Sequence, residues 1–149
     1  MDDKWLWDHM ADMQAGLYAL LKNALREKVK AGNKSPLFAD GQNRLENESG
    51  FIAGELVNIV AYSMGKEIAN ATGDAMIVKE LDQYQNNIMK DPALRSHLSD
   101  KQIERAELYG VVYYLVMKGR PADEISRRTG ISHEELGRVT NDVSWFLGE

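Results

Sequence analysis

Apolar side chains that recur every three or four positions are the feature that most restricts how this chain can fold. An α-helix completes a turn in about 3.6 residues, so side chains at this spacing share one face. Over residues 4–30 the spacing predicts a long helix with a single apolar stripe. We expect this stripe to form a seam of a helical bundle, and it would also suit a dimer contact. Its members are Leu6, Met10, Met13, Leu17, Leu20 and Ala24.

Two tryptophans near the start of this helix fall on different faces. Because only one residue separates them, Trp5 and Trp7 cannot both point into one core. Two interpretations stay open: one indole belongs to a surface for a partner, or the helix end is tucked beneath a neighbouring element. The candidate surface for a partner or a second copy consists of Trp5, Trp7, Met10, Met13 and Leu17. A homodimer is therefore expected.

Helical spacing continues through most of the chain. Residues 31–44 combine Gly, Asn, Ser, Pro and Asp, which favour turns, and they form a predicted loop. Helices are expected at about 48–71, 75–89 and 100–117. On the second of these, the side chains that fall in register on one face are Ile77, Leu81, Tyr84 and Ile88.

The predicted fold is all-α, a bundle of about six helices that ends in a helix-turn-helix. Residues 1–100 would form the bundle and a region suited to dimerisation. Residues 101–149 would pack on it as a module or continue it as one domain. The small residues Gly50, Gly54 and Ser63 would permit another backbone to approach closely.

Composition narrows the classes of function. The chain has 149 residues, a formal net charge of -5 and no cysteine, so disulfides and thiolate sites are excluded and a reducing, cytoplasmic location is expected. The longest apolar stretch, residues 108–117, is too short to span a bilayer, and the N-terminal segment lacks the pattern of a signal peptide. None of the three histidines has a second histidine at helical spacing, so no metal site and no cofactor are predicted.

Residues 119–139, "GRPADEISRRTGISHEELGRV", have the composition of two short helices joined by a tight turn. Pro121 suits the first turn of a helix, Gly130 ends that helix, and Ser132 can cap the next one. Glu135 follows the cap by three residues and completes a capping-box pattern.

Over residues 103–147 this pattern resembles the helix-turn-helix family, in particular the three-helix domains of phage-type and sigma-factor-like transcription regulators. The residues that carry the resemblance are Ile125, Ser126, Gly130, Ile131, Ser132, Leu136 and Val139. The resemblance implies that residues 132–147 form a helix that enters the DNA major groove. The residues that it places against bases or phosphates are Ser132, His133, Gly137, Arg138 and Asn141, together with Lys118, Arg120, Arg127 and Arg128.

Two features depart from the family's pattern. The predicted reading helix holds three carboxylates, Glu134, Glu135 and Asp142, against the one permanent cation Arg138. Thr129 stands where an apolar residue is commoner. Since no segment of the chain is strongly basic, two hypotheses follow. One is a DNA-binding transcriptional regulator of phage or mobile-element type, and the other is an acidic helical interaction module or inhibitor that binds a host protein.

Arg128 and His133 form an Arg-x4-His pattern that resembles the helical nucleases called HEPN domains. In that family the arginine and histidine act together on an RNA phosphate. Here the two residues straddle the predicted turn and do not share one helix face. The sequence has no Gly-rich phosphate loop after a strand and no arrangement of Ser, His and Asp that favours nucleophilic catalysis, so no enzymatic activity is expected.

Overall fold

The computed structural model describes residues 4–32, 41–141 and 144–147, and in these ranges the regular structure is helical throughout. The predicted all-α fold is confirmed. No helix within these ranges is both long and apolar enough to cross a membrane. The helices in chain order are α1 (Lys4–Gly32), α2 (Gly41–Thr72), α3 (Ala75–Met89), α4 (Pro92–Arg95), α5 (Asp100–Met117), α6 (Ala122–Thr129), α7 (His133–Asn141) and α8 (Ser144–Leu147).

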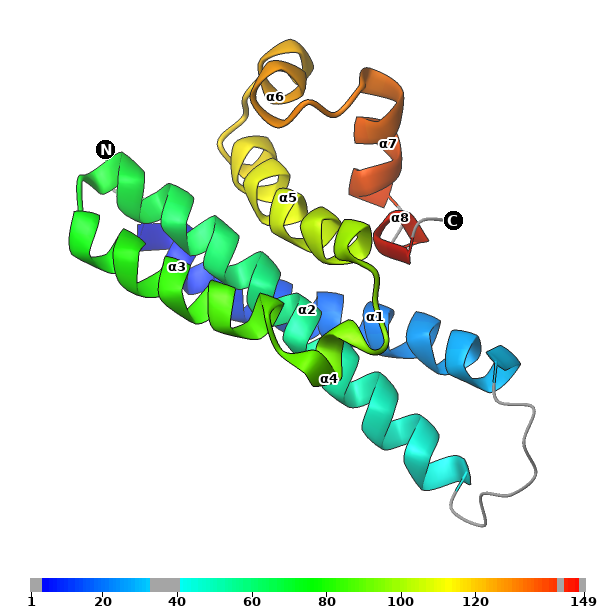
Figure 1. Cartoon of the computed structure of the whole chain (residues 1–149). Helices are drawn as coiled ribbons and strands as arrows, with labels where there is room; N and C mark the ends of the chain where they lie inside the picture. The colour runs from blue at the N-terminus through cyan, green and yellow to red at the C-terminus, as the bar shows by residue number, and fades with distance from the viewer. Residues whose placement is uncertain (1–3, 33–40, 142–143, 148–149) are drawn as a thin grey trace.

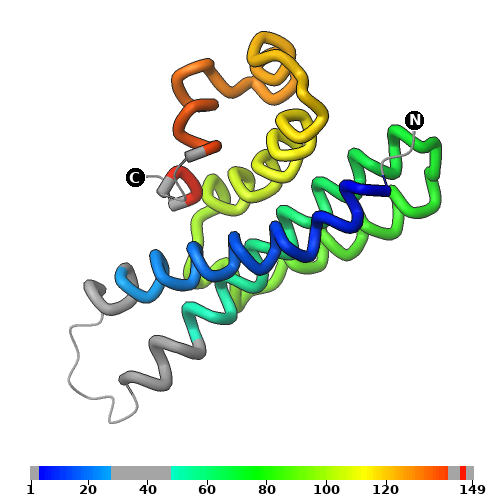
Figure 2. Tube along the Cα trace, turned by 180° about the vertical axis from the view of Figure 1, so that it is seen from behind, coloured from blue at the N-terminus to red at the C-terminus, as the bar shows by residue number. Residues whose placement is uncertain are grey.

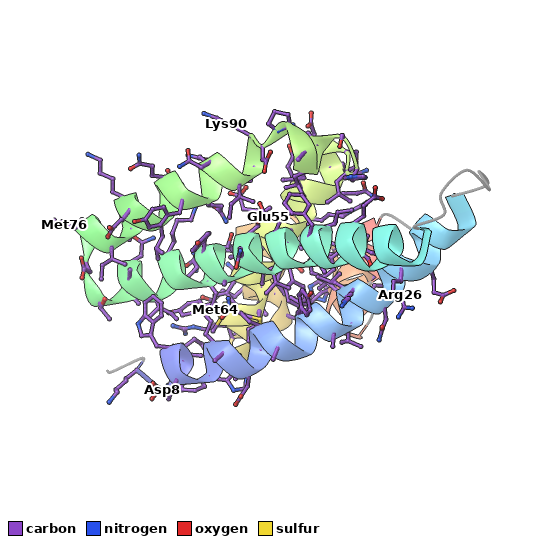
Figure 3. The ribbon with its side chains drawn as sticks, turned by 90° about the horizontal axis from the view of Figure 1, so that it is seen from below. Asp8, Arg26, Glu55, Met64, Met76 and Lys90 are labelled. Atoms are coloured by element: carbon purple, nitrogen blue, oxygen red, sulfur yellow. The ribbon has the colours of Figure 1, made fainter. Side chains whose placement is uncertain are left out.

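Three long helices form a layer, and the rest of the chain stands on one face of it. α1, α2 and α3 lie side by side with α2 in the middle, as the view from below shows (Figure 3). α5 crosses this layer and carries α6, α7 and α8 on the same side (Figures 1 and 2). α2 packs against α1, α3 and α5, so it is the central core helix.

Two predicted boundaries differ from the structure. The connection between the first two helices is shorter than the loop expected at 31–44, because α1 continues to Gly32 and α2 already begins at Gly41. Residues that favour turns are only a weak guide when helix formers such as Gln42 and Arg44 lie among them. The single helix expected at 132–147 is described as two helices, α7 and α8, and residues 142–143 lie outside the described ranges.

The predicted seam of α1 is confirmed except at one position. Leu6, Met13 and Leu17 are buried in the core. Leu20 is 57% exposed, and Leu21 takes its place in the core. One residue is about 100° around a helix, so Leu20 lies at the margin of the stripe, on the side away from Leu21 and Leu25.

The seam of α3 is only half covered, because α3 is an edge helix of the layer and packs mainly against α2. Of the residues expected in register, Ile77 and Tyr84 are exposed. The buried side chain is instead Gln85, whose amide nitrogen donates to the Ile59 carbonyl at 2.9 Å and to the Ser63 hydroxyl at 2.6 Å. This buried amide is partnered, which fixes the register of α3 on α2.

α5 crosses α2 at a distance that only glycine allows. A Cβ atom on Gly110 would lie 2.4 Å from the Val60 carbonyl oxygen and 2.5 Å from the Ser63 Cβ. The expectation that Ser63 sits where another backbone approaches is therefore confirmed, and Gly110 is its partner. Gly50 and Gly54 face the side chain of Tyr18 instead.

Replacing Gly110 with alanine should destabilise the fold. The new methyl group meets backbone atoms that cannot move without parting the two helices, and overpacking of this kind costs about 1–3 kcal/mol. Gly16→Ala is the matched control: a Cβ there meets nothing within 4 Å, so the gain in helix propensity should raise stability by about 0.5–1 kcal/mol. Urea unfolding measures both changes. Equal stability of the two variants would contradict the close crossing.

Candidate interaction surface of helices α6 and α7

The predicted turn has the backbone that the sequence indicated. Gly130 ends α6 in the left-handed conformation with φ of 76°, which glycine adopts without strain. Ile131 follows it into the core. The Ser132 hydroxyl accepts a hydrogen bond from the Glu135 backbone N–H at 3.1 Å and donates to the Glu135 carboxylate at 3.4 Å. Ser132 therefore caps α7.

Thr129, which departs from the pattern of helix-turn-helix domains, stabilises the same turn. Its hydroxyl donates to the Ile125 carbonyl at 2.7 Å and accepts from the Ile131 backbone N–H at 3.3 Å. The threonine thus joins the end of α6 to the start of the turn, so a polar residue has a structural role here.

The module formed by α6, α7 and α8 rests on α5 through aromatic side chains of α8. Trp145 and Phe146 of α8 are buried, and the Phe146 ring lies 4.8 Å from the ring of Tyr109. The Arg105 guanidinium lies 5.8 Å from the centroid of the Trp145 ring. α8 therefore closes the module against α5, while Ile125, Leu136 and Val139 form its interior.

The residues predicted to meet DNA divide between two places. Ser132, His133, Gly137 and Arg138 are exposed on or beside α7. The side chain of Asn141 lies outside the described residues. A second group, Lys118, Arg120 and Arg128, lines a cleft of about 300 Å³ together with Glu67 and Asn70 of α2 and Glu124 of α6. Arg127 is exposed on α6, and its guanidinium donates to the Asp123 carbonyl at 3.4 Å.

Three of these predicted contacts already have carboxylate partners within the chain. The Arg128 guanidinium lies 2.6 Å from the Glu67 carboxylate, which is 15% exposed. His133 Nε2 lies 2.9 Å from the Asp123 carboxylate, and Arg120 lies 4.0 Å from Glu124. A phosphate would have to compete with each of these acids.

Glu67 is the residue of this candidate site that sequence reasoning missed. It lies on α2, 61 positions before Arg128, and no local pattern connects the two. The pair ties α6 to the bundle and lines the cleft between them. Because Arg128 is about half exposed, the pair contributes little stability, on the order of 0.2–1 kcal/mol.

The first turn of α7 is acidic at its surface. Glu134 and Glu135 are both exposed there, which suits the positive end of the helix dipole. Residues 100–149 carry seven Lys or Arg and nine Asp or Glu, a balance of -2. The exposed start of α7 therefore presents carboxylates to whatever meets it.

The two residues of the nuclease pattern contact different carboxylates. Arg128 on α6 contacts Glu67 of α2, and His133 on α7 contacts Asp123 of α6 across the turn. In the described parts of the chain, no group of three or more His, Cys, Asp or Glu side chains could hold a metal ion.

The second predicted surface, on α1, needs a correction. Met13 and Leu17 are 7% and 6% exposed, because α1 uses its stripe for the core of its own chain. Met10 is half-buried against the same core. Trp7 lies over Gly65 of α2, where a Cβ would come within 3.3 Å of the indole, and it is 39% exposed, so both interpretations of the tryptophans stay open. Trp5 is 45% exposed and remains a candidate contact.

Comparison of the chain with protein-family models, with curated proteins and with solved structures found no match. The geometry and charges described above are therefore the basis for a functional assignment.

Proposed function

We propose that this chain is a regulatory protein whose helix-turn-helix module binds a basic surface of a protein partner. The observation that carries the proposal is the exposed acidic turn at the start of α7, formed by Glu134 and Glu135. In the helix-turn-helix mode of DNA binding, this is the part of the helix that meets base edges.

Two further observations support a protein partner over DNA. DNA binding draws most of its affinity from cations that replace counterions at phosphates. Here Arg120 and Arg128 lie beside carboxylates and His133 contacts Asp123, so a phosphate would compete with an acid of the chain at each of them. A partner with Lys or Arg side chains would instead be attracted by the α7 acids.

The class of partner follows from the same chemistry. A protein with a basic groove for nucleic acid offers Lys and Arg at a spacing that suits an acidic helix, so the module would compete with nucleic acid for that groove. This is the action expected of a phage or mobile-element inhibitor. The absence of cysteine suits a reducing compartment, and the proposal places the protein in the cytoplasm. The proposal does not include a dimer through the α1 stripe, because Met13 and Leu17 are buried in the core of their own chain.

DNA is the second candidate because the turn between α6 and α7 is built from the residues that carry the resemblance to helix-turn-helix domains. Gly130, Ile131 and Ser132 form the turn, and α7 is exposed along the side that carries Ser132, Gly137 and Arg138. A helix placed in this way can enter a major groove where its charges permit.

Removing the α7 acids should create DNA affinity that the natural chain lacks. In about 50 mM salt, where phosphate contacts count most, we expect a pool of random duplexes to bind the natural chain with a Kd weaker than about 100 µM. Glu134→Gln with Glu135→Gln should strengthen binding several-fold, whereas the exposed Glu80→Gln on α3 should not. Fluorescence anisotropy measures all three. Selection of a preferred sequence whose binding falls by about 1–3 kcal/mol in Arg138→Ala would establish DNA as the target instead.

A photo-reactive amino acid at Thr140, on the exposed side of α7, should cross-link to protein in native cells. Glu134→Lys should abolish the adduct, because it repels a basic surface, while Glu80→Lys makes the same change in charge on α3 and should leave the adduct in place. Mass spectrometry identifies the partner, and the account requires that its cross-linked peptide lie on a basic surface. Adducts to DNA alone, or adducts insensitive to Glu134→Lys, would refute the proposal.

A further inference from the structure

A shallow groove of about 300 Å³ runs between α1 and α5, away from the helix-turn-helix turn. Its walls are His9, Asp12, Gly16 and Leu20 of α1 and Tyr109 and Tyr113 of α5, above a floor of Met13 and Leu17. The floor side chains belong to the core, whereas Leu20 is 57% exposed. A Cβ on Gly16 would meet nothing within 4 Å, so the groove is open where α1 has no side chain.

The α5 wall is held in place by aromatic contacts. His9 Nε2 lies 2.8 Å from the Tyr113 hydroxyl, and the two rings are stacked with an angle of 8° between their planes. Tyr109 packs between Tyr113 and Phe146 of α8. Its ring centroid lies 6.0 Å from that of Tyr113 and 4.8 Å from that of Phe146. A wall built in this way is preorganised, which lowers the cost of binding.

Both tyrosines keep their protons near neutral pH. Burial raises the pKa of Tyr109, with a smaller contribution from the neighbouring Tyr113. Burial also raises the pKa of Tyr113. The groove therefore offers neutral hydroxyl groups and no phenolate.

Exposed apolar side chains also lie on both helices about one turn beyond residues that line the groove. Trp5 stands one turn before His9 on α1 and is 45% exposed, and Val116 stands about one turn after Tyr113 on α5 and is 42% exposed. Leu20 continues the apolar edge at the other end of the α1 wall. Aromatic residues and leucine spread over several turns suit the apolar face of an amphipathic helix.

The charge at the rim decides which helix fits. Asp12 is the one permanently charged side chain among the described residues that line the groove, and Asp8 is exposed one turn before it. A helix with acids along its polar edge would be repelled here, and one with Lys or Arg would be attracted.

We propose that this groove binds an amphipathic helix of another protein, with its apolar residues between α1 and α5 and a Lys or Arg facing Asp12. The groove is a second interaction surface, and it does not depend on what the helix-turn-helix module binds.

The probe is a labelled 18-residue peptide of Leu and Lys with the leucines on one helical face. Its matched controls are the same pattern with Glu in place of Lys and a scrambled Leu/Lys sequence. Anisotropy should show micromolar binding of the first peptide to the full chain and at least ten-fold weaker binding of the other two. No binding of the first peptide, or equal binding of all three, would overturn the proposal.

A variant that fills the groove distinguishes binding of the peptide in the groove from a general attraction of a basic peptide to an acidic protein. Gly16→Leu places a side chain in open space, so the chain should still fold and the Leu/Lys peptide should bind at least ten-fold more weakly. Gln83→Leu adds the same side chain to an exposed position on α3 and should change nothing. Equal binding of the Leu/Lys peptide by the two variants would refute the proposal that the peptide binds in the groove. Sedimentation of the natural chain as a dimer that Gly16→Leu dissociates would show that a second copy is the occupant and would also overturn the proposal.

Discussion

The contact between Gly110 of α5 and the Val60–Ser63 turn of α2 is the constraint on which the rest of the structure depends. It brings α5 directly onto the central helix of the layer, and α5 then supports everything that follows. One side of α5 anchors α6 and α8. Another side supplies Tyr109 and Tyr113 to the groove. Both proposed interaction surfaces therefore take their geometry from one close helix crossing, because neither could form if α5 stood further away.

Charge decides how the resulting surfaces are used. A tight turn joins α6 to α7, as expected from the resemblance to helix-turn-helix domains, yet Glu67, Asp123 and Glu124 each lie beside a side chain that DNA binding would use. The start of α7 adds two more carboxylates. Geometry and electrostatics thus point to different ligands, and electrostatics governs affinity at a phosphate backbone. The same acidic character at Asp12 is the basis for proposing a basic helix in the groove.

Local features of the fold could be predicted from the sequence, and features set by distant packing could not. The turn at Gly130 and the cap at Ser132 depend on a few neighbouring residues, so their residue types were sufficient. Leu20 was misjudged and the burial of Gln85 was not predicted, because their exposure depends on which helix covers that side of α1 or α3. The partner of Arg128 could not be predicted for the same reason. Glu67 lies close to Arg128 only because α5 crosses over α2. The acids of α7 could be predicted from the sequence, but the ion pairs of the neighbouring cations could not.

The most direct test is a chemical-shift titration of the isotope-labelled protein with two ligands, an oligo-arginine peptide and a random-sequence DNA duplex, at about 50 mM salt. The account predicts that amide signals of residues 132–138 shift with the peptide, and shift more than those around Glu80 and Asp82 on α3. It predicts no such shifts with the duplex. Shifts of the α7 amides with DNA at lower concentration than with the peptide would contradict the central claim.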